Sequence, residues 1–269
     1  MTLAFHRQGE GPPVVLLHGG GPGASATSNF GRTITALAPR FDVIAVDQPG
    51  YGGSVEEHIT GQYFTFASRC VVELLDKLGL DRVDVVGNSL GGGTAVRMAL
   101  DAPDRVRRLL LMGPGGLSLN VFAADPTEGV KRLGAFARDP SRERIGAFLR
   151  TLVFDPSLIT SDLIDERFGQ ASSPAALRAM GEMGASFAAF PEEGLLWREA
   201  HRIRHETLLV WGREDRVNPL DGALVALKLL RNARLHVFGG CGHWAHLEKF
   251  DEFNRLAIDF LSSSKGAYS

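Results

Sequence analysis

The chain of 269 residues is 44% hydrophobic and 22% charged, and its formal net charge is −2 at pH 7. This composition is typical of a soluble globular protein with one sizeable core, and the nearly balanced charge argues against a partner such as nucleic acid or an anionic membrane. The N-terminal residues lack a signal-peptide pattern, no apolar run approaches the roughly 20 residues that cross a bilayer, and two cysteines, Cys70 and Cys241, cannot form a disulfide framework. We therefore expect a soluble, cytoplasmic protein.

Short apolar runs rich in β-branched residues recur along the chain, at residues 13–18, 41–47, 83–88, 108–113, 207–212 and 235–240. Each is typical of a buried parallel strand. Between them, as at 66–80 and 91–103, apolar residues recur at the spacings of three and four that indicate helices. This alternation predicts an α/β fold with a doubly wound, mostly parallel sheet.

The interval 117–196 contains no convincing strand, only helix-like pieces rich in Phe, Met and Leu. Its seven phenylalanines fit packing between helices; they are Phe122, Phe136, Phe148, Phe154, Phe168, Phe187 and Phe190. As a group they predict a helical cap (lid) inserted in a core formed by residues 1–116 and 197–269, with an apolar cavity beneath it.

The run LLHGGGPGASATSNF, residues 16–30, follows the first predicted strand and has two interpretations. Residues 19–24 fit the G-x-G-x-x-A pattern of a dinucleotide-binding turn, and Asp47 ends the next strand, where an acid could bind a ribose. Pro22 fits this poorly, and the chain has no G-x-x-x-x-G-K-[ST] phosphate loop. Alternatively, the glycine amides stabilise an oxygen that becomes negative only during a reaction, which requires a nucleophile elsewhere.

The segment VDVVGNSLGGG supplies that nucleophile. Gly87, Ser89 and Gly91 form G-x-S-x-G between a predicted strand and a predicted helix. A sharp turn there exposes the serine hydroxyl, and small residues on either side avoid clashes in a strained backbone. The motif alone is weak, and its strand–turn–helix context is what favours a nucleophilic serine.

A serine nucleophile needs a base and an acid that orients the base, in the chain order Ser, Asp or Glu, His. Asp215 follows one predicted strand and His243 follows the last, so both open at the same edge of the sheet as Ser89. Glu214 and, more weakly, Asp221 are rivals for the acid.

His243 and His246 stand one helical turn apart and resemble a metal-binding pair, but no third ligand has suitable spacing. We expect no metal, a packed His246, and a Cys241 that is a small buried residue and not a nucleophile. The backbone amide of Leu90 and one from Gly20 or Gly21 would then form an oxyanion hole.

Taken together, these motifs resemble the α/β-hydrolase superfamily, and more closely its meta-cleavage product hydrolases, which cut carbon–carbon bonds in ring-fission products. The resemblance spans nearly the whole chain and rests most specifically on HGGGPGA, GNSLGG and CGHW. The segments GPGGLSLNVFAADPTEGVKRL and DRVNPLDGALVALK are most similar to the subgroup of actinobacterial steroid catabolism. Relatives usually have an extra N-terminal edge strand, so either the assigned start is late or the sheet edge is shorter here.

The resemblance implies roles for individual residues. Ser89, Asp215 and His243 match the catalytic triad, and Gly20 and Leu90 match the oxyanion donors. The substrate-binding positions that match are Gly19, Gly21, Asn29, Asn88, Arg167 and Trp244. Of these, Arg167 would pair with a substrate carboxylate through both guanidinium nitrogens.

The implied reaction is hydrolysis of the C5–C6 bond of a 2-hydroxy-6-oxo-2,4-dienoate, by a homo-oligomer (dimer or larger) that needs no cofactor. The group on C6 could be a steroid remnant, a phenyl ring or an alkyl chain, selected by Phe122, Leu152 and Met180. The alternatives are a carboxylesterase or thioesterase with the same triad, a non-catalytic ligand receptor, and a dinucleotide-binding oxidoreductase.

Overall fold

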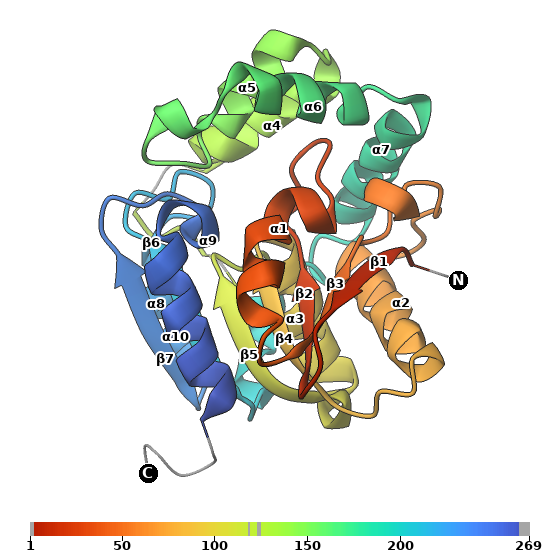
Figure 1. Cartoon of the computed structure of the whole chain (residues 1–269). Coiled ribbons are helices and arrows are strands. Elements are labelled where there is room, and N and C mark those ends of the chain that lie inside the picture. The colour runs from red at the N-terminus through yellow and green to blue at the C-terminus, as the bar shows by residue number, and fades with distance from the viewer. Residues whose placement is uncertain (1–2, 118, 123–124, 264–269) are drawn as a thin grey trace.

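The computed structural model describes residues 3–117, 119–122 and 125–263, and these form a seven-stranded sheet in the order β1-β3-β2-β4-β5-β6-β7 (Figure 1). Its strands are β1 (Phe5–Gln8), β2 (Pro13–Leu17), β3 (Asp42–Val46), β4 (Val83–Asn88), β5 (Val106–Met112), β6 (Glu206–Gly212) and β7 (Ala233–Phe238). Strands β2 to β7 are all parallel to their neighbours, whereas β1 runs antiparallel to β3. The predicted doubly wound, mostly parallel sheet is confirmed.

Helices cover both faces of the sheet: α1 (Ala26–Leu37), α2 (Tyr63–Lys77), α3 (Leu90–Asp101), α8 (Asp221–Leu229), α9 (Ala245–Glu248) and α10 (Phe250–Ser262). Side chains of successive strand residues point to opposite faces, so Val15 and Leu17 pack in one core cluster with α2 and α3. Val14 and Leu16 pack in the other with α1 and α10. Strands buried on both faces explain the continuous apolar runs in the sequence.

Strand β1 was not predicted. Its four residues, FHRQ, are all exposed, so they have no hydrophobic alternation to read. Arg7 of β1 donates from Nε, at 2.8 Å, to the carboxylate of Asp42 on the paired strand.

Between β5 and β6 the described residues form helices and no strand: α4 (Glu128–Arg138), α5 (Arg142–Leu149), α6 (Ser161–Ala171) and α7 (Pro174–Ala189). We call these four the inserted helices. Each begins after a Ser or Thr whose hydroxyl accepts from a first-turn amide; these caps are Thr127, Ser141, Thr160 and Ser173. In Figure 1, α4, α5 and α6 lie together beyond one end of the sheet.

The inserted helices have a hydrophobic cluster of their own, which includes Phe136, Ile145, Phe148 and Leu149 and extends to Trp244 of the core. The seven phenylalanines of this region do not all pack: Phe122 is 89% exposed and Phe154 is 54% exposed. In the described part of the chain, no helix is both long enough and apolar enough to cross a membrane.

Candidate active site

The loops that follow the parallel strands meet at one edge of the sheet, beneath the inserted helices, around a cavity of about 970 Å³. The cavity is lined from the core by segments after β2, β3, β4, β5, β6 and β7. Its other side is lined by apolar residues of the inserted helices, among them Leu133, Phe148, Met180 and Phe187. The predicted apolar cavity is therefore present.

Ser89 stands between β4 and α3 with φ 52° and ψ −113°, and it is the one non-glycine residue with a positive φ in the described ranges. Its backbone is fixed by hydrogen bonds, since its N–H donates to Met112 O at 2.9 Å and its C=O accepts from Gly115 N–H at 2.7 Å. A strained serine that is tied down in this way is typical of a site where a hydroxyl must be presented at a sharp turn.

Glycines make this turn possible. A Cβ at Gly87 would lie 2.6 Å from Gly91 O, and a Cβ at Gly91 would collide with the carbonyl of Leu17 at the end of β2. Strand β2 and helix α3 thus approach at a distance that only glycine allows.

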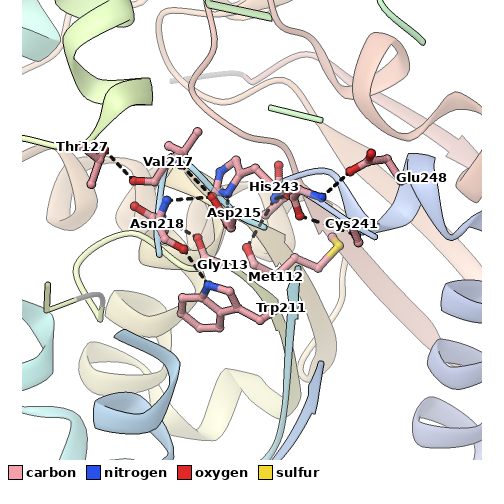
Figure 2. Close-up of polar contacts among 12 residues, drawn as sticks. Met112, Gly113, Thr127, Trp211, Asp215, Val217, Asn218, Cys241, His243 and Glu248 are labelled. Carbon is pink, nitrogen blue, oxygen red and sulfur yellow. Dashed lines mark hydrogen bonds and ion pairs between the residues drawn. The ribbon is translucent and has the colours of Figure 1, made fainter. Parts of the chain in front are cut away.

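Asp215 and His243 are bonded to each other, with Asp215 Oδ2 at 2.6 Å from His243 Nδ1, and both side chains are almost fully buried (Figure 2). Because a carboxylate only accepts, Nδ1 carries the proton and Nε2 has the free lone pair. The other carboxylate oxygen of Asp215 accepts from the amides of Val217 and Asn218 at 2.8 and 2.9 Å. The acid is therefore held in one orientation.

The two rival acids lie elsewhere. Glu214 accepts from the amide of Cys241 at 3.0 Å and from Arg213 at 2.7 Å. Asp221 accepts from the amides of Val121 and Phe122. Of the three candidate acids, Asp215 is the one bonded to His243.

Ser89 and His243 line the same cavity. Within the described part of the chain, His243 Nε2 is buried and has no hydrogen-bond partner, so its lone pair is available to a hydroxyl or a ligand in the cavity. A hydroxyl at a strained turn and a tautomer-fixed imidazole at one cavity can perform nucleophilic catalysis.

The glycine run lies against the start of α3, because a Cβ at Gly20 would come within 2.8 Å of the Leu90 side chain. As the first residue of α3, Leu90 has an N–H with no acceptor inside the helix. Gly19, Gly20, Gly21 and Leu90 all line the cavity beside Ser89. The predicted oxyanion donors are thus adjacent.

Two buried side chains hold the carbonyls of the glycine run. Tyr51 donates from its hydroxyl to Gly20 O at 2.9 Å, and His18 Nδ1 lies 2.9 Å from Gly19 O. Nε2 of His18 accepts from the Gln48 amide at 3.1 Å, so the ring must be neutral, and burial lowers its pKa to about 4.

The carboxylate of Asp47, the acid of the dinucleotide interpretation, is already bonded to backbone amides. Its two carboxylate oxygens accept from Ala26 N–H at 2.6 Å and from Gly53 N–H at 2.8 Å. The first of these amides belongs to the first residue of helix α1, whose first turn is also capped by the side chain of Ser25. A carboxylate used in this way favours the oxyanion interpretation of the glycine run over ribose binding.

Arg167, on α6, is fully buried. Its Nε donates to Pro22 O and its Nη1 to Ser28 Oγ, both at 3.1 Å, while Nη2 has no partner among the described residues. Burial lowers the pKa of Arg167 to about 10, which still leaves the guanidinium charged at neutral pH. A Cβ at Gly21 would crowd Nη2 at 3.1 Å.

The other predicted pocket residues line the same cavity as this cation. Trp244 lies with its ring 5.8 Å from the Arg167 guanidinium carbon. Asn29 and Asn88 line the cavity, and each has a buried side-chain oxygen without a partner in the described structure. Asn88 also donates to Met112 O and to His243 O, at 3.3 and 3.4 Å. All the predicted site residues except Asp215 therefore line one cavity, and Asp215 is bonded to His243, which does line it.

His246 and Cys241 are both buried. His246 packs against Phe30 with ring centroids 5.0 Å apart, and burial lowers its pKa to about 4. Burial raises the pKa of the Cys241 thiol. Within the described residues, no group of three or more His, Cys, Asp or Glu side chains is placed to hold a metal ion.

Of the predicted selectivity residues, Leu152 and Met180 line the cavity, but the prediction for Phe122 is wrong. Phe122 lies in the loop after β5, where its amide is bound to Asp221 and its ring points into solvent. Sequence reasoning missed Tyr51, which the motif DQPGYGGS could have indicated. It also missed Glu248, whose carboxylate accepts from the amide of Gly242 next to His243; the segment HLEK carries no signal beyond that of a helix surface.

Comparison with known proteins places these features in context. Residues 12–250 match a family model described as alpha/beta hydrolase fold. The chain is 40% identical over 265 residues to a 2-hydroxy-6-oxo-6-phenylhexa-2,4-dienoate hydrolase of Comamonas testosteroni, covering 96% of this chain and 91% of that protein. It is 38% identical to a 2-hydroxy-6-oxononadienedioate/2-hydroxy-6-oxononatrienedioate hydrolase of Pseudomonas putida, covering 97% and 92%.

Among solved structures, a 2-hydroxy-6-oxo-6-phenylhexa-2,4-dienoate hydrolase from Rhodococcus sp. strain RHA1 superposes with a TM-score of 0.87 at 30% identity, covering 97% of this chain and all of the other. A meta-cleavage product hydrolase from Pseudomonas fluorescens IP01 gives 0.83 at 35% identity, covering 96% and 93%. Neither these names nor those of the two relatives above mention a steroid, so closeness to the steroid subgroup stays a prediction.

Proposed function

Since the chain belongs to the α/β-hydrolase family, and within it to the meta-cleavage product hydrolases, we propose that it hydrolyses the C5–C6 bond of a 2-hydroxy-6-oxo-2,4-dienoate. The products are a 2-hydroxydienoate and a carboxylic acid. In this proposal Ser89, His243 and Asp215 form the catalytic triad, and the amides of Gly20 and Leu90 form the oxyanion hole.

The observation that carries the proposal is the buried Arg167. A charged guanidinium with a free nitrogen, fully removed from water, requires an anion to offset its desolvation. It lies in the cavity that also holds Ser89 and His243, so the same ligand can reach all three. A dienoate carries a carboxylate at one end and its scissile carbonyl further along, whereas a simple ester has no charge for Arg167 to bind.

The reaction begins with His243, whose Nε2 helps to convert the dienol into its keto tautomer, with a proton delivered to C5. Ser89 Oγ then attacks the C6 carbonyl and passes its proton to His243 Nε2, and the oxyanion on C6 is held by the two amides. Cleavage of C5–C6 leaves its electron pair on C5, conjugated through to the oxygen on C2, and His243 returns the proton. Water finally hydrolyses the acyl-enzyme.

Covalent attack by Ser89 is favoured over direct attack by water because the chain holds this one hydroxyl at a strained turn. Asn29, Asn88 and Trp244, with the glycines at 19 and 21, would line the carboxylate end of the substrate. Leu152 and Met180 lie on the wall available to the C6 group.

Residues 117–196 are proposed as a cap domain on the core formed by 1–116 and 197–269, supported by the separate hydrophobic cluster of the inserted helices. We further propose a cytoplasmic homo-oligomer. The two buried free thiols, Cys70 and Cys241, are consistent with a reducing compartment.

The test of the proposal compares a dienoate with p-nitrophenyl acetate in the wild type and in Arg167→Met, which keeps most of the volume without the charge. Losing the partner of the carboxylate should lower kcat/KM for the dienoate by about 100-fold or more, because a charge-assisted pair in a buried site contributes a few kcal/mol. Turnover of the neutral ester should change by less than about threefold. Equal losses on both substrates would argue against a carboxylate-binding role, and an unchanged dienoate rate would favour an ester as the natural substrate.

A further inference from the structure

Two charged side chains outside the triad converge on one short segment of the inserted region. This segment, residues 150–155, joins α5 to the short helix Pro156–Leu158, and we call it the 150–155 turn. It lies against the loop that holds His243, since a Cβ at Gly242 would come within 2.9 Å of Leu152 O.

Glu248, at the end of α9, bridges the 150–155 turn and the loop of His243. One of its carboxylate oxygens accepts from the amides of Phe154 and Asp155, at 2.6 and 3.1 Å. The other accepts from the amide of Gly242, next to His243 in the chain, at 2.5 Å. Figure 2 shows Glu248 directed at the loop that carries Cys241 and His243.

Arg216, next to the acid Asp215, reaches the same turn from the other side. Its guanidinium donates to the carbonyls of Arg150 and Val153, the latter at 3.1 Å, and lies 3.4 Å from the Glu128 carboxylate of α4. The loop that carries Asp215 is therefore bonded to the inserted region through Arg216, the next residue in the chain.

The middle of the 150–155 turn is bonded directly to the backbone of His243. The carbonyl of Leu152 accepts from the amides of His243 and Trp244, at 2.8 and 3.1 Å. The backbone that carries the imidazole thus takes its position from a segment of the inserted region, and that segment is held by Glu248 and Arg216.

We propose that Glu248 is a positioning residue for His243, and that with Arg216 it clamps the 150–155 turn so that the base and the inserted helices are placed as one unit. The proposal relies on the proposed function only in taking His243 as the base that activates Ser89. The two oxygens of Glu248 accept from two parts of the chain at once, whereas a glutamine would present to one of those parts an NH2 group, which cannot accept from a backbone amide.

The test measures the second-order rate at which a fluorophosphonate labels Ser89, which requires activation by His243 but no dienoate. Glu248→Gln keeps the shape of the side chain and leaves one acceptor oxygen, and we expect it to be labelled about tenfold more slowly than the wild type. Glu248→Ala removes both oxygens and should be labelled about 100-fold more slowly, which is the size of effect that a displacement of roughly 1 Å produces. Glu252→Gln, the same change at an exposed position of α10, is the matched control and should label at the wild-type rate. Ser89→Ala gives the background.

Rates are measured well below each variant's Tm and per folded molecule, so that loss of stability alone does not alter them. Arg216→Met tests the clamp from the acid side and should also slow labelling by about tenfold, and it carries the comparison if Glu248→Gln does not fold. Wild-type labelling rates in both Glu248→Gln and Arg216→Met would overturn the proposal. Failure of the wild type itself to label would overturn the triad, whereas normal labelling without dienoate cleavage would overturn the proposed substrate and leave the clamp standing.

Discussion

At Ser89 the backbone adopts a conformation that costs about 1–3 kcal/mol for a residue with a side chain. The surrounding contacts hold it in place, since the serine amide and carbonyl are both bonded and the absence of a Cβ at Gly87 and Gly91 allows the close approach that the turn requires. Ser89 lines the same cavity as a histidine whose tautomer Asp215 fixes.

A substitution at the acid tests this role. Asp215→Asn can donate to Nδ1 and so favours the wrong tautomer of His243, and we expect kcat to fall by roughly 10³–10⁴-fold with the substrate still bound. Glu214→Gln, one residue earlier, is the matched control and should retain most activity, because Glu214 is bonded to Arg213 and Cys241 and not to the base. Steady-state kinetics on a dienoate measures both; a near-normal rate in Asp215→Asn would refute the assignment of the acid.

Among the elements, the loop after β2 carries one of the two proposed oxyanion donors. Its glycines have no side chains to hold them, and Tyr51 and the loop's own His18 bond their carbonyls instead. The conformation of this loop therefore depends in part on Tyr51, a residue that the glycine motif does not contain.

Tyr51→Phe removes the hydrogen bond to Gly20 O, and we expect kcat to fall by about tenfold with KM within about twofold, because the oxyanion exists only after attack. Tyr63→Phe is the control, since its hydroxyl also donates to a buried backbone carbonyl, that of Pro49, but away from the glycine run. If kcat in Tyr51→Phe equals that of the Tyr63→Phe control, the loop does not need this bond.

The elements that could be predicted from sequence are those with a strong local signal. Strands β2 to β7 lie within about two residues of the predicted runs because burial on both faces demands continuous apolar residues. Strand β1 could not be found, since an exposed edge of four residues has no such demand. Phe122 was placed wrongly because composition does not indicate which way an isolated ring in a loop will point.

For the molecule as a whole, the buried histidines predict how stability depends on pH. His18 and His246 have pKa values lowered to about 4 by burial, below the ordinary 6.5, so the unfolded chain binds more protons than the folded one between these values. Stability should be fully present above about pH 6.5 and fall as the pH drops towards 4.

His246→Leu should reduce this dependence. We expect the wild type to lose about 2 kcal/mol at pH 5 through His246, because its pKa is lowered from 6.5 to about 4, and the variant should lack that part of the loss. Urea unfolding of both proteins at pH 8 and pH 5 measures the difference, independently of any change in stability at pH 8. Equal losses in the two proteins would mean that His246 is not the titrating group.

At the same scale, the residues of the proposed triad could be chosen from sequence because each follows a predicted parallel strand, and such strands end at one edge of the sheet. The 150–155 turn could not be linked to them, because its hydrogen bonds with His243 and Trp244 join segments about 90 residues apart through backbone groups that any sequence offers. Likewise, nothing in the sequence around Arg167 indicates that its side chain binds Pro22 and Ser28, which lie about 140 residues earlier in the chain.

The most direct measurement follows the yellow dienolate of a 2-hydroxy-6-oxo-6-phenylhexa-2,4-dienoate together with its products, in the wild type and in Ser89→Ala. Our account predicts that the wild type bleaches the colour and releases benzoate and 2-hydroxypenta-2,4-dienoate in equal amounts, while the variant binds the dienolate and releases neither. Release of both products by Ser89→Ala at the wild-type rate, or bleaching by the wild type without a carboxylic acid product, would contradict it.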